Sequence, residues 1–348
     1  MSATQLIKPQ RLRRGDKVAI VSLSSGMLGE RRFRHKYELG RQRLETLFGL
    51  EVVSMPHALK GIDYLYEHPE KRAEDWMTAC EDRSIRAIIT AIGGDDGIRL
   101  LPYVDFGVLR RNPKIFLGYS DTTAHHLMMV RAGVVSFYGP ALMSDFAAYG
   151  RMSDYTVRAV RELLFEAKAD WTIEKCPYWE AGRLAWSRKN IDRQEERLTD
   201  DAGYETLQGE GRVCGPLMGG CVDAFPMYCG SAAWPDASMW EGCILFLETS
   251  KDCPSPDYLA YYLRGLGAQG ILTAARGLIV GKPCRNRYYE AYKSVYRRIL
   301  REFGREEMPV LYNVNFGHCA PIGILPYGIR CEVDATARTL RLCESCVL

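Results

Sequence analysis

The sequence has no long apolar run and little net charge. No stretch approaches the roughly 20 apolar residues that cross a bilayer, so we expect no membrane segment. The 46 basic and 43 acidic residues leave a net charge of +3, which argues against a nucleic-acid partner. The N-terminal stretch MSATQLIKPQRLRRGDK has basic residues but no apolar core, so it does not resemble a signal peptide. These absences predict a cytoplasmic protein.

Spacings typical of metal and nucleotide sites are also missing. The 12 cysteines show no metal-ligand spacing, and the one CxxC, Cys343 to Cys346, lies at the C-terminus without a second pair. Scattered cysteines of this kind are typical of a reducing cytoplasm. The chain lacks both GxGxxG and a P-loop lysine, and the pair Asp95-Asp96 has no partner carboxylates at a suitable spacing. We therefore expect no metal and no cofactor, and a nucleotide-dependent enzyme is disfavoured.

The first half of the chain alternates between strand-like and helix-like segments. Strands are expected at 16–25, 51–56, 85–94, 113–120 and 134–140, with helices at 30–49, 69–82, 121–133 and 155–167. This order predicts a parallel sheet with helices on both faces, forming a domain over residues 1–167. Functional sites in such sheets lie beyond the carboxyl ends of the strands.

The second half is less regular. Residues 168–210 are polar and show little periodicity, so we interpret them as a linker or long loop. Residues 211–348 contain four short apolar runs, two helical segments and a final hairpin-like pair that turns at 334–336. This pattern predicts a smaller sheet or barrel with helices attached, and the fold class is α/β.

Ser120 ends an apolar strand in KIFLGYSDTTAHH and precedes a helix. A serine at such a turn can be a nucleophile, since the turn exposes its side chain and directs backbone N–H groups at a substrate. The pattern GxSDT departs from the common GxSxG, however. A helix N-cap is the alternative, and this stretch alone favours it.

A serine nucleophile needs a base and an acid. Of the six histidines, His318 stands out because it lies in an irregular loop, NVNFGHCAPIGILPYG. His125 and His126 are poor candidates, because their helix carries them away from the strand end. Glu248 ends the apolar strand of CILFLETS and could orient the histidine. A structural histidine and an exposed glutamate remain the alternatives.

Two glycines in AIGGDDGIRLL could form an oxyanion hole, because they allow close approach of backbone N–H groups to a developing charge. Five ordered segments then resemble the LD-carboxypeptidase family of serine peptidases: AIGGDDGIRLLPYVDF, NPKIFLGYSDTTA, FYGP, LFLETS and GHCAPIGILPYG. That family includes the muramoyl-tetrapeptide carboxypeptidases and the microcin C self-immunity proteins. The resemblance extends over nearly the whole chain.

The resemblance implies a Ser-Glu-His triad of Ser120, Glu248 and His318, with oxyanion donors from the backbone of Gly94 and Asp121. It also implies a Rossmann-like N-terminal domain, a C-terminal swivelling β-barrel-like domain that carries Glu248 and His318, and a homodimer. Neither a metal nor a cofactor is implied.

The likeness in the linker and in FLETS…PSP favours the microcin branch, whose substrates are aminoacyl-nucleotides or peptides. Tyr204 stands near the position of that branch's substrate-stacking tryptophan, and Cys221 stands where asparagine is frequent. Lys251 could meet an anionic substrate group, although a solvated lysine is the simpler interpretation. The alternatives are a muramoyl-tetrapeptide LD-carboxypeptidase that releases terminal D-Ala, and a non-catalytic small-molecule binding module.

Overall fold

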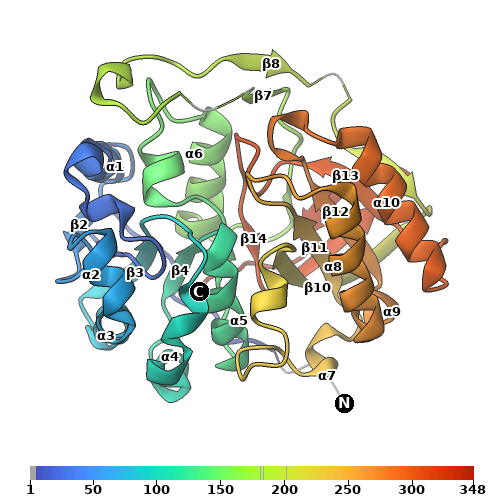
Figure 1. Cartoon of the computed structure of the whole chain (residues 1–348), viewed down its shortest axis with the longest axis horizontal. Helices are drawn as coiled ribbons and strands as arrows, with labels where there is room; N and C mark the ends of the chain where they lie inside the picture. Colours follow the sequence, from blue (N-terminus) through green and yellow to red (C-terminus); the bar gives the residue numbers. More distant parts are fainter. Residues whose placement is uncertain (1–4, 181, 183, 201) are drawn as a thin grey trace.

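The computed structural model describes residues 5–180, 182, 184–200 and 202–348, which form two α/β units side by side (Figure 1). The first unit has a six-stranded sheet whose strand order is β14-β5-β4-β3-β1-β2. Its strands are β1 (Lys17–Val21), β2 (Glu51–Ser54), β3 (Ile85–Thr90), β4 (Ile115–Gly118), β5 (Phe137–Tyr138) and β14 (Leu325–Pro326). Strands β1 to β5 run parallel, which confirms the predicted sheet, whereas β14 pairs antiparallel with β5. A short strand from near the end of the chain therefore completes the first sheet.

Helices surround this sheet. They are α1 (Arg34–Phe48), α2 (Ile62–Glu67), α3 (Pro69–Glu81), α4 (Phe106–Arg111), α5 (Thr123–Arg131) and α6 (Asp154–Val160). Two short 3-10 helices, η3 (Gly97–Tyr103) and η4 (Ser120–Thr122), precede α4 and α5. The α1 helix ends at Gly49, whose φ of 69° lies in the left-handed region that glycine adopts at helix ends. The alternation predicted for this half is therefore present.

The second unit has an eight-stranded sheet in the order β6-β16-β15-β10-β11-β12-β13-β9. Its strands are β6 (Trp171–Thr172), β9 (Glu205–Gln208), β10 (Arg212–Cys221), β11 (Ile244–Glu248), β12 (Gly277–Gly281), β13 (Val310–Val314), β15 (Arg330–Asp334) and β16 (Thr339–Leu342). Strands β10 to β13 are parallel neighbours, and the outer pairs are antiparallel. The barrel-like domain of the sequence analysis takes the form of an open mixed sheet.

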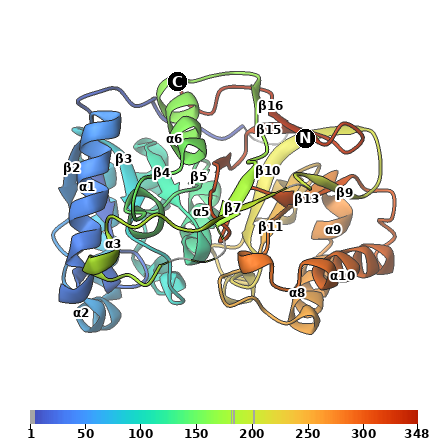
Figure 2. The same ribbon diagram turned by 90° about the horizontal axis from the view of Figure 1, so that it is seen from above.

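Four helices accompany the second sheet: α7 (Ala237–Trp240), α8 (Pro256–Ala268), α9 (Ile271–Ala274) and α10 (Tyr289–Glu302). Figure 2 shows α8 and α10 next to each other. The Ser255 hydroxyl caps α8 by accepting a hydrogen bond from the Tyr258 N–H, and Pro256 occupies the first helical turn. None of the helices in the described part of the chain has the length and apolarity of a membrane span.

The segment 168–210, expected to be a linker or loop, contains more structure than its sequence indicates. It supplies β6 and β9 at the two edges of the second sheet, and a hairpin of β7 (Tyr178–Glu180) and β8 (Arg197–Thr199). The hairpin and the chain around it extend over both units (Figure 1). Strands of two to four residues are too short to produce a recognisable alternation of apolar and polar residues.

Candidate active site

Ser120 is the first residue of η4, at the sharp turn that follows β4. All four residues of β4 are buried, so the strand end is fixed by the core. The φ angle of Ser120 is 68°, in a region that residues other than glycine rarely adopt. Tyr119 occupies the cap position of η4, where no side chain forms a capping hydrogen bond. The N-cap interpretation of Ser120 is therefore wrong, and the strained strand-to-helix turn resembles a nucleophile elbow.

Gly93, in the loop after β3, packs directly against this turn. A Cβ atom at Gly93 would lie 2.7 Å from the Cβ and 2.9 Å from the Oγ of Ser120. The Gly93 carbonyl accepts a hydrogen bond from the Ser25 N–H at 3.2 Å, which ties this loop to the loop after β1. Because any side chain at this position would displace Ser120, close packing explains the first glycine of AIGGDD.

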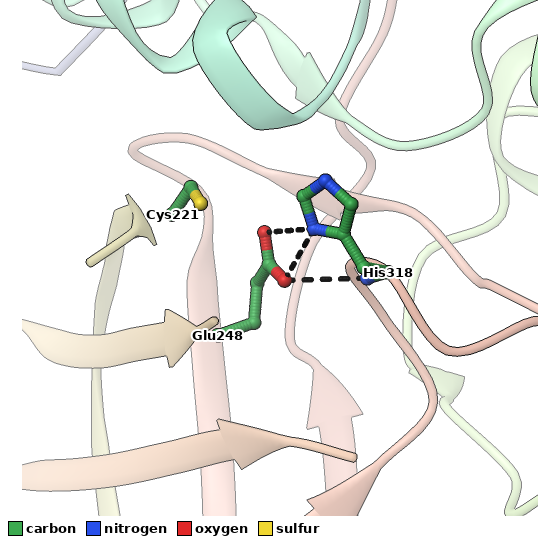
Figure 3. A group of neighbouring side chains, drawn as sticks. All are labelled: Cys221, Glu248 and His318. Atoms are coloured by element: carbon green, nitrogen blue, oxygen red, sulfur yellow. Dashed lines mark hydrogen bonds and ion pairs between the residues drawn. The ribbon is translucent and has the colours of Figure 1, made fainter. Parts of the chain in front are cut away.

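The structure brings Ser120, Glu248 and His318 together. His318 Nε2 lies 3.0 Å from Ser120 Oγ, and His318 Nδ1 lies 2.8 Å and 3.1 Å from the two carboxylate oxygens of Glu248. Figure 3 shows the Glu248 carboxylate directed at the His318 ring. In the tautomer that carries its proton on Nδ1, His318 donates to Glu248 and its Nε2 accepts a hydrogen bond from the serine hydroxyl. The three side chains have the geometry of a hydrolytic triad.

Local backbone geometry helps hold Glu248 and His318 together. Glu248 is the last residue of β11 and is only 1% exposed. Its Oε2 also accepts a hydrogen bond from the His318 backbone N–H at 3.2 Å. Gly317 has a φ of 85°, and a Cβ there would come within 2.5 Å of the Glu248 carboxyl group. The glycine of the GHC segment is therefore needed for the loop to close over the carboxylate.

Tyr138, at the end of β5, is connected to the triad although the sequence analysis did not assign it a role. Its hydroxyl donates a hydrogen bond to Glu248 Oε1 at 2.5 Å and accepts one from the Ser120 N–H at 3.2 Å. Its side chain is fully buried. The FYGP segment contained this tyrosine, but nothing in a lone tyrosine of a short apolar strand indicates such a contact.

The side chain of Asp121 is a second feature that the sequence analysis missed. Its carboxylate accepts hydrogen bonds from Ser24 Oγ at 2.5 Å, from the Gly97 N–H at 2.8 Å and from the Tyr228 hydroxyl. These partners come from the loop after β1, from the loop after β3 and from the second unit. The carboxylate therefore fixes the start of η4 against three segments around the site.

Of the two predicted oxyanion donors, Asp121 directly follows Ser120, and Gly94 is one residue beyond the glycine that packs on the serine. The Asp121 N–H belongs to the first turn of η4, where N–H groups have no partner within the helix. Gly94 follows Gly93 in the loop that contacts the serine, and its residue is exposed. A donor role for these two N–H groups stays a prediction.

Asp96, considered above as half of an acidic pair, forms ion pairs instead. Its carboxylate contacts Arg72 Nη1 at 2.8 Å and Arg99 Nη1 at 3.1 Å. Burial by itself would raise the pKa of Asp96, but hydrogen bonds and charges from the two arginines lower it overall. This pairing holds the 93–97 loop in place.

Cys221, Glu248 and His318 each place a possible ligand atom within 4.8 Å of the others, and no other described residues form such a group (Figure 3). Glu248 and His318 are hydrogen-bonded to each other, however. Burial, followed by the charge of Asp223, raises the pKa of Cys221 well above its ordinary value. The thiol is therefore protonated and donates to Asp223 Oδ1 at 3.0 Å. A protonated thiol beside a paired carboxylate and imidazole fits a triad better than a metal site.

The two predicted substrate contacts differ in placement. Lys251 is exposed and follows β11 closely, three residues beyond Glu248. Tyr204 is 3% exposed, and its hydroxyl donates to the backbone carbonyl groups of Ile173 and Glu174. The structure therefore does not bring Tyr204 to the triad, and a ring buried there has no free face for a substrate base.

His125 and His126 lie in α5 and are fully buried, which agrees with their expected packing role. Burial lowers the pKa of each to about 3. His126 bonds to Ser136 Oγ and to the Gly118 carbonyl group, both at 2.9 Å. Neither histidine forms a hydrogen bond with Ser120 Oγ in the described structure, whereas His318 does.

The serine lies at the end of a parallel-sheet strand, and a histidine and a glutamate from the second unit lie beside it. This arrangement defines a hydrolase-like α/β protein. The chain matches the models of the LD-carboxypeptidase N-terminal domain over residues 18–139 and of the LD-carboxypeptidase C-terminal domain over residues 214–333. Together these matches cover more than half of the chain. The protein belongs to the LD-carboxypeptidase family.

Individual relatives agree with this assignment. A putative carboxypeptidase of Treponema pallidum is 27% identical over 346 residues, covering 97% of this chain and 96% of the relative. The microcin C7 self-immunity protein MccF of Escherichia coli is 25% identical over 277 residues, covering 79% and 78%. The crystal structure of an MccF-like protein from Streptococcus pneumoniae in complex with AMP is 35% identical, with a TM-score of 0.87, covering 94% of this chain and 98% of the other.

Proposed function

We propose that this protein is a serine hydrolase that cleaves an amide bond with a triad of Ser120, Glu248 and His318. The observation that carries the proposal is the continuous hydrogen-bonded line from Ser120 Oγ through the His318 ring to the Glu248 carboxylate. Membership of a family that includes putative carboxypeptidases supports peptidase chemistry.

The reaction begins when His318 Nε2 accepts the proton of Ser120 and Oγ attacks the amide carbonyl carbon. Negative charge then develops on the carbonyl oxygen, where the N–H groups of Gly94 and Asp121 would stabilise it. Glu248 holds the His318 ring in orientation and stabilises its charged form. His318 next gives its proton to the leaving amine, and an acyl group stays on Ser120.

Water completes the cycle. His318 accepts a proton from a water molecule, whose oxygen attacks the acyl carbon. The second tetrahedral species collapses, Ser120 Oγ takes the proton back from His318, and the carboxylic acid leaves. Every proton transfer in this sequence uses Nε2, the atom that lies 3.0 Å from the serine oxygen.

For the substrate we propose an aminoacyl-nucleotide or a related peptide. The likeness to MccF and to the AMP-bound MccF-like protein supports this class. Lys251, exposed three residues after the triad glutamate, would meet an anionic group of such a substrate. Because Tyr204 is buried, it is not part of this proposal.

Two alternatives make different predictions. A muramoyl-tetrapeptide LD-carboxypeptidase would release D-Ala from a peptidoglycan tetrapeptide, whereas a binding module would release nothing. Mass spectrometry after incubation with an aminoacyl-sulfamoyl adenosine and, separately, with the tetrapeptide distinguishes the substrates. Loss of at least about 10³-fold in rate for Ser120→Ala, with an unchanged fold, is expected. An active Ser120→Ala variant would contradict the mechanism.

The homodimer expected from the family resemblance is also a proposal. Light scattering of the purified protein tests it directly, and a monomer at assay concentration would contradict it. The catalytic steps above use residues of a single chain.

A further inference from the structure

The hydroxyl group of Tyr138 connects parts of the triad that come from different units of the fold. Tyr138 ends β5 and is paired in register with Gly118 of β4, two residues before Ser120. Glu248 ends β11 in the other sheet. The Tyr138 hydroxyl is 2.5 Å from Glu248 Oε1 and 3.2 Å from the Ser120 nitrogen.

We propose that Tyr138 is a positioning residue of the triad, whose hydroxyl fixes the Glu248 carboxylate and the Ser120 backbone relative to each other so that His318 can bond to both. This inference rests on the proposed function, since it assigns a role within that reaction. Tyr138 acts through Glu248 and Ser120 and does not itself touch the reacting atoms.

The direction of both hydrogen bonds follows from the protonation of the Tyr138 hydroxyl. Burial, followed by the charge of Glu248, raises the pKa of Tyr138 well above its ordinary value, so the hydroxyl stays protonated. Its single proton points to the carboxylate, and an oxygen lone pair accepts the Ser120 N–H. One group thus satisfies a buried charge and a buried backbone donor in a strained turn.

The hydrogen bond from Tyr138 also determines which oxygen of the Glu248 carboxylate makes the shorter contact with His318. With Oε1 occupied by Tyr138, Oε2 makes the shorter contact with His318 Nδ1 and accepts the His318 backbone N–H. Without the phenol, the carboxylate would have one donor fewer and greater freedom to rotate. A more weakly solvated carboxylate attracts the charged imidazolium more strongly, which makes His318 harder to deprotonate.

Packing holds the ring independently of the hydroxyl. The Tyr138 ring lies 5.5 Å from that of Phe246 and 6.4 Å from that of Phe316, measured between ring centroids. A phenylalanine at position 138 would therefore keep the ring in place and remove only the hydroxyl. Glu248, Cys221 and Tyr119 are titratable groups that lie near His318 in the described structure, and the substitution leaves all three unchanged.

The experiment measures the rate at which a fluorophosphonate probe labels Ser120 in the full-length chain, from about pH 5 to about pH 9. This reaction uses the serine and the base but needs no knowledge of the substrate. For Tyr138→Phe we expect the labelling rate to fall about 10-fold or more. We also expect the pH at which the rate is half-maximal to move upward by about half a unit or more.

Tyr327→Phe is the matched control. Tyr327 is also fully buried, its ring centroid lies 6.5 Å from that of Tyr138, and its hydroxyl donates to the Gly219 carbonyl at 2.7 Å. Its loss removes a comparable buried hydrogen bond that does not involve the triad. This variant should label at the wild-type rate with the wild-type pH dependence, although it is destabilised to a similar degree.

A second replacement covers the case in which Tyr138→Phe does not fold. Site-specific replacement of Tyr138 with 3-fluorotyrosine keeps the hydroxyl and makes it a stronger donor, so the half-maximal pH should move downward. Wild-type rate and pH dependence in a folded Tyr138→Phe, or no shift with 3-fluorotyrosine, would overturn the positioning role alone. Failure of the wild-type protein to label at Ser120 would overturn the proposed function itself.

Discussion

The carboxylate of Asp200 lies 3.3 Å from the Nζ atom of Lys282, and both side chains are buried, at 5% and 2% exposure. Asn313 adds two hydrogen bonds of 3.2 Å from its Nδ2 atom to the same carboxylate. Asp200 directly follows β8, whereas Lys282 directly follows β12. The ion pair therefore fastens the end of the β7–β8 hairpin to the second sheet.

Removing one charge of this pair should destabilise the protein. Asp200→Asn leaves the buried Lys282 charge without its carboxylate, and we expect the free energy of unfolding to fall by about 3 kcal/mol. The double variant Asp200→Asn with Lys282→Met removes both charges and should regain more than half of the loss. Urea unfolding of the two variants and the wild type measures the difference. Equal stability of the single and double variants would show that the pair is not buried as described.

A methyl group at Gly93 should impair the nucleophile without unfolding the protein. Gly93→Ala would place a Cβ 2.7 Å from that of Ser120, so the serine or its loop must move. We expect fluorophosphonate labelling of Ser120 to slow by about 10²-fold, because misplacement by about an ångström costs that much in positioned reactions.

Gly265→Ala is the control for this substitution. Gly265 is exposed in α8, and a Cβ there would have no atom within 4 Å. It should leave labelling unchanged and stabilise the helix by about 0.5–1 kcal/mol. Comparable labelling of the two variants would contradict the close packing of Gly93 on Ser120.

Glu248→Gln tests the orientation of the base. The amide keeps the volume of the side chain but can present N–H groups to His318 Nδ1, which favours the tautomer that carries its proton on Nε2. That tautomer cannot accept the serine proton, so we expect labelling to fall about 10³-fold with little loss of fold. Circular dichroism and the labelling rate are measured on the same sample. Labelling within a few-fold of the wild type would remove Glu248 from the mechanism.

The sequence was sufficient for the architecture of the first unit because its signals are local. Buried strands that alternate with helices identify a parallel sheet, and the longer helices, such as α1 and α3, show their period. Strand β14 escaped notice because two residues near the end of the chain carry no such period, although they complete the first sheet. The same limit applies to β6 and β9, which lie in the segment interpreted as a linker.

In the candidate site, too, some residues could be predicted from the sequence and others could not. Ser120, Glu248 and His318 were proposed from the sequence because they end strands or interrupt a regular pattern, and because family segments surround them. Tyr138 and the carboxylate of Asp121 act through contacts between segments more than 100 residues apart, since their partners include Glu248 and Tyr228. Single-sequence patterns contain no information on such contacts. Tyr204 was expected to contact the substrate because of its position in the sequence, but its side chain is buried. A position near a motif does not show whether a side chain is exposed.

His125 should make the protein sensitive to acid. Burial lowers its pKa to about 3, whereas the unfolded chain takes up the proton near pH 6.5. The unfolded state therefore binds more protons than the native state below pH 6.5, so stability falls as the pH drops from there towards 3. The loss amounts to about 1.4 kcal/mol for each pH unit in that window.

His125→Leu removes this dependence at little cost. Neither ring nitrogen of His125 has a hydrogen-bond partner among the residues described, and the ring packs on Trp76 at 5.2 Å between centroids. A leucine of similar volume should therefore be tolerated at pH 7. Lowering the pH from 7 to 5 should raise the free energy of unfolding of His125→Leu by about 2 kcal/mol relative to that of the wild type. His126→Leu, which breaks two buried hydrogen bonds, should be less stable than His125→Leu at either pH. Urea unfolding at both pH values measures these differences, and a constant gap between His125→Leu and the wild type would mean that His125 takes up its proton equally in the folded and unfolded states.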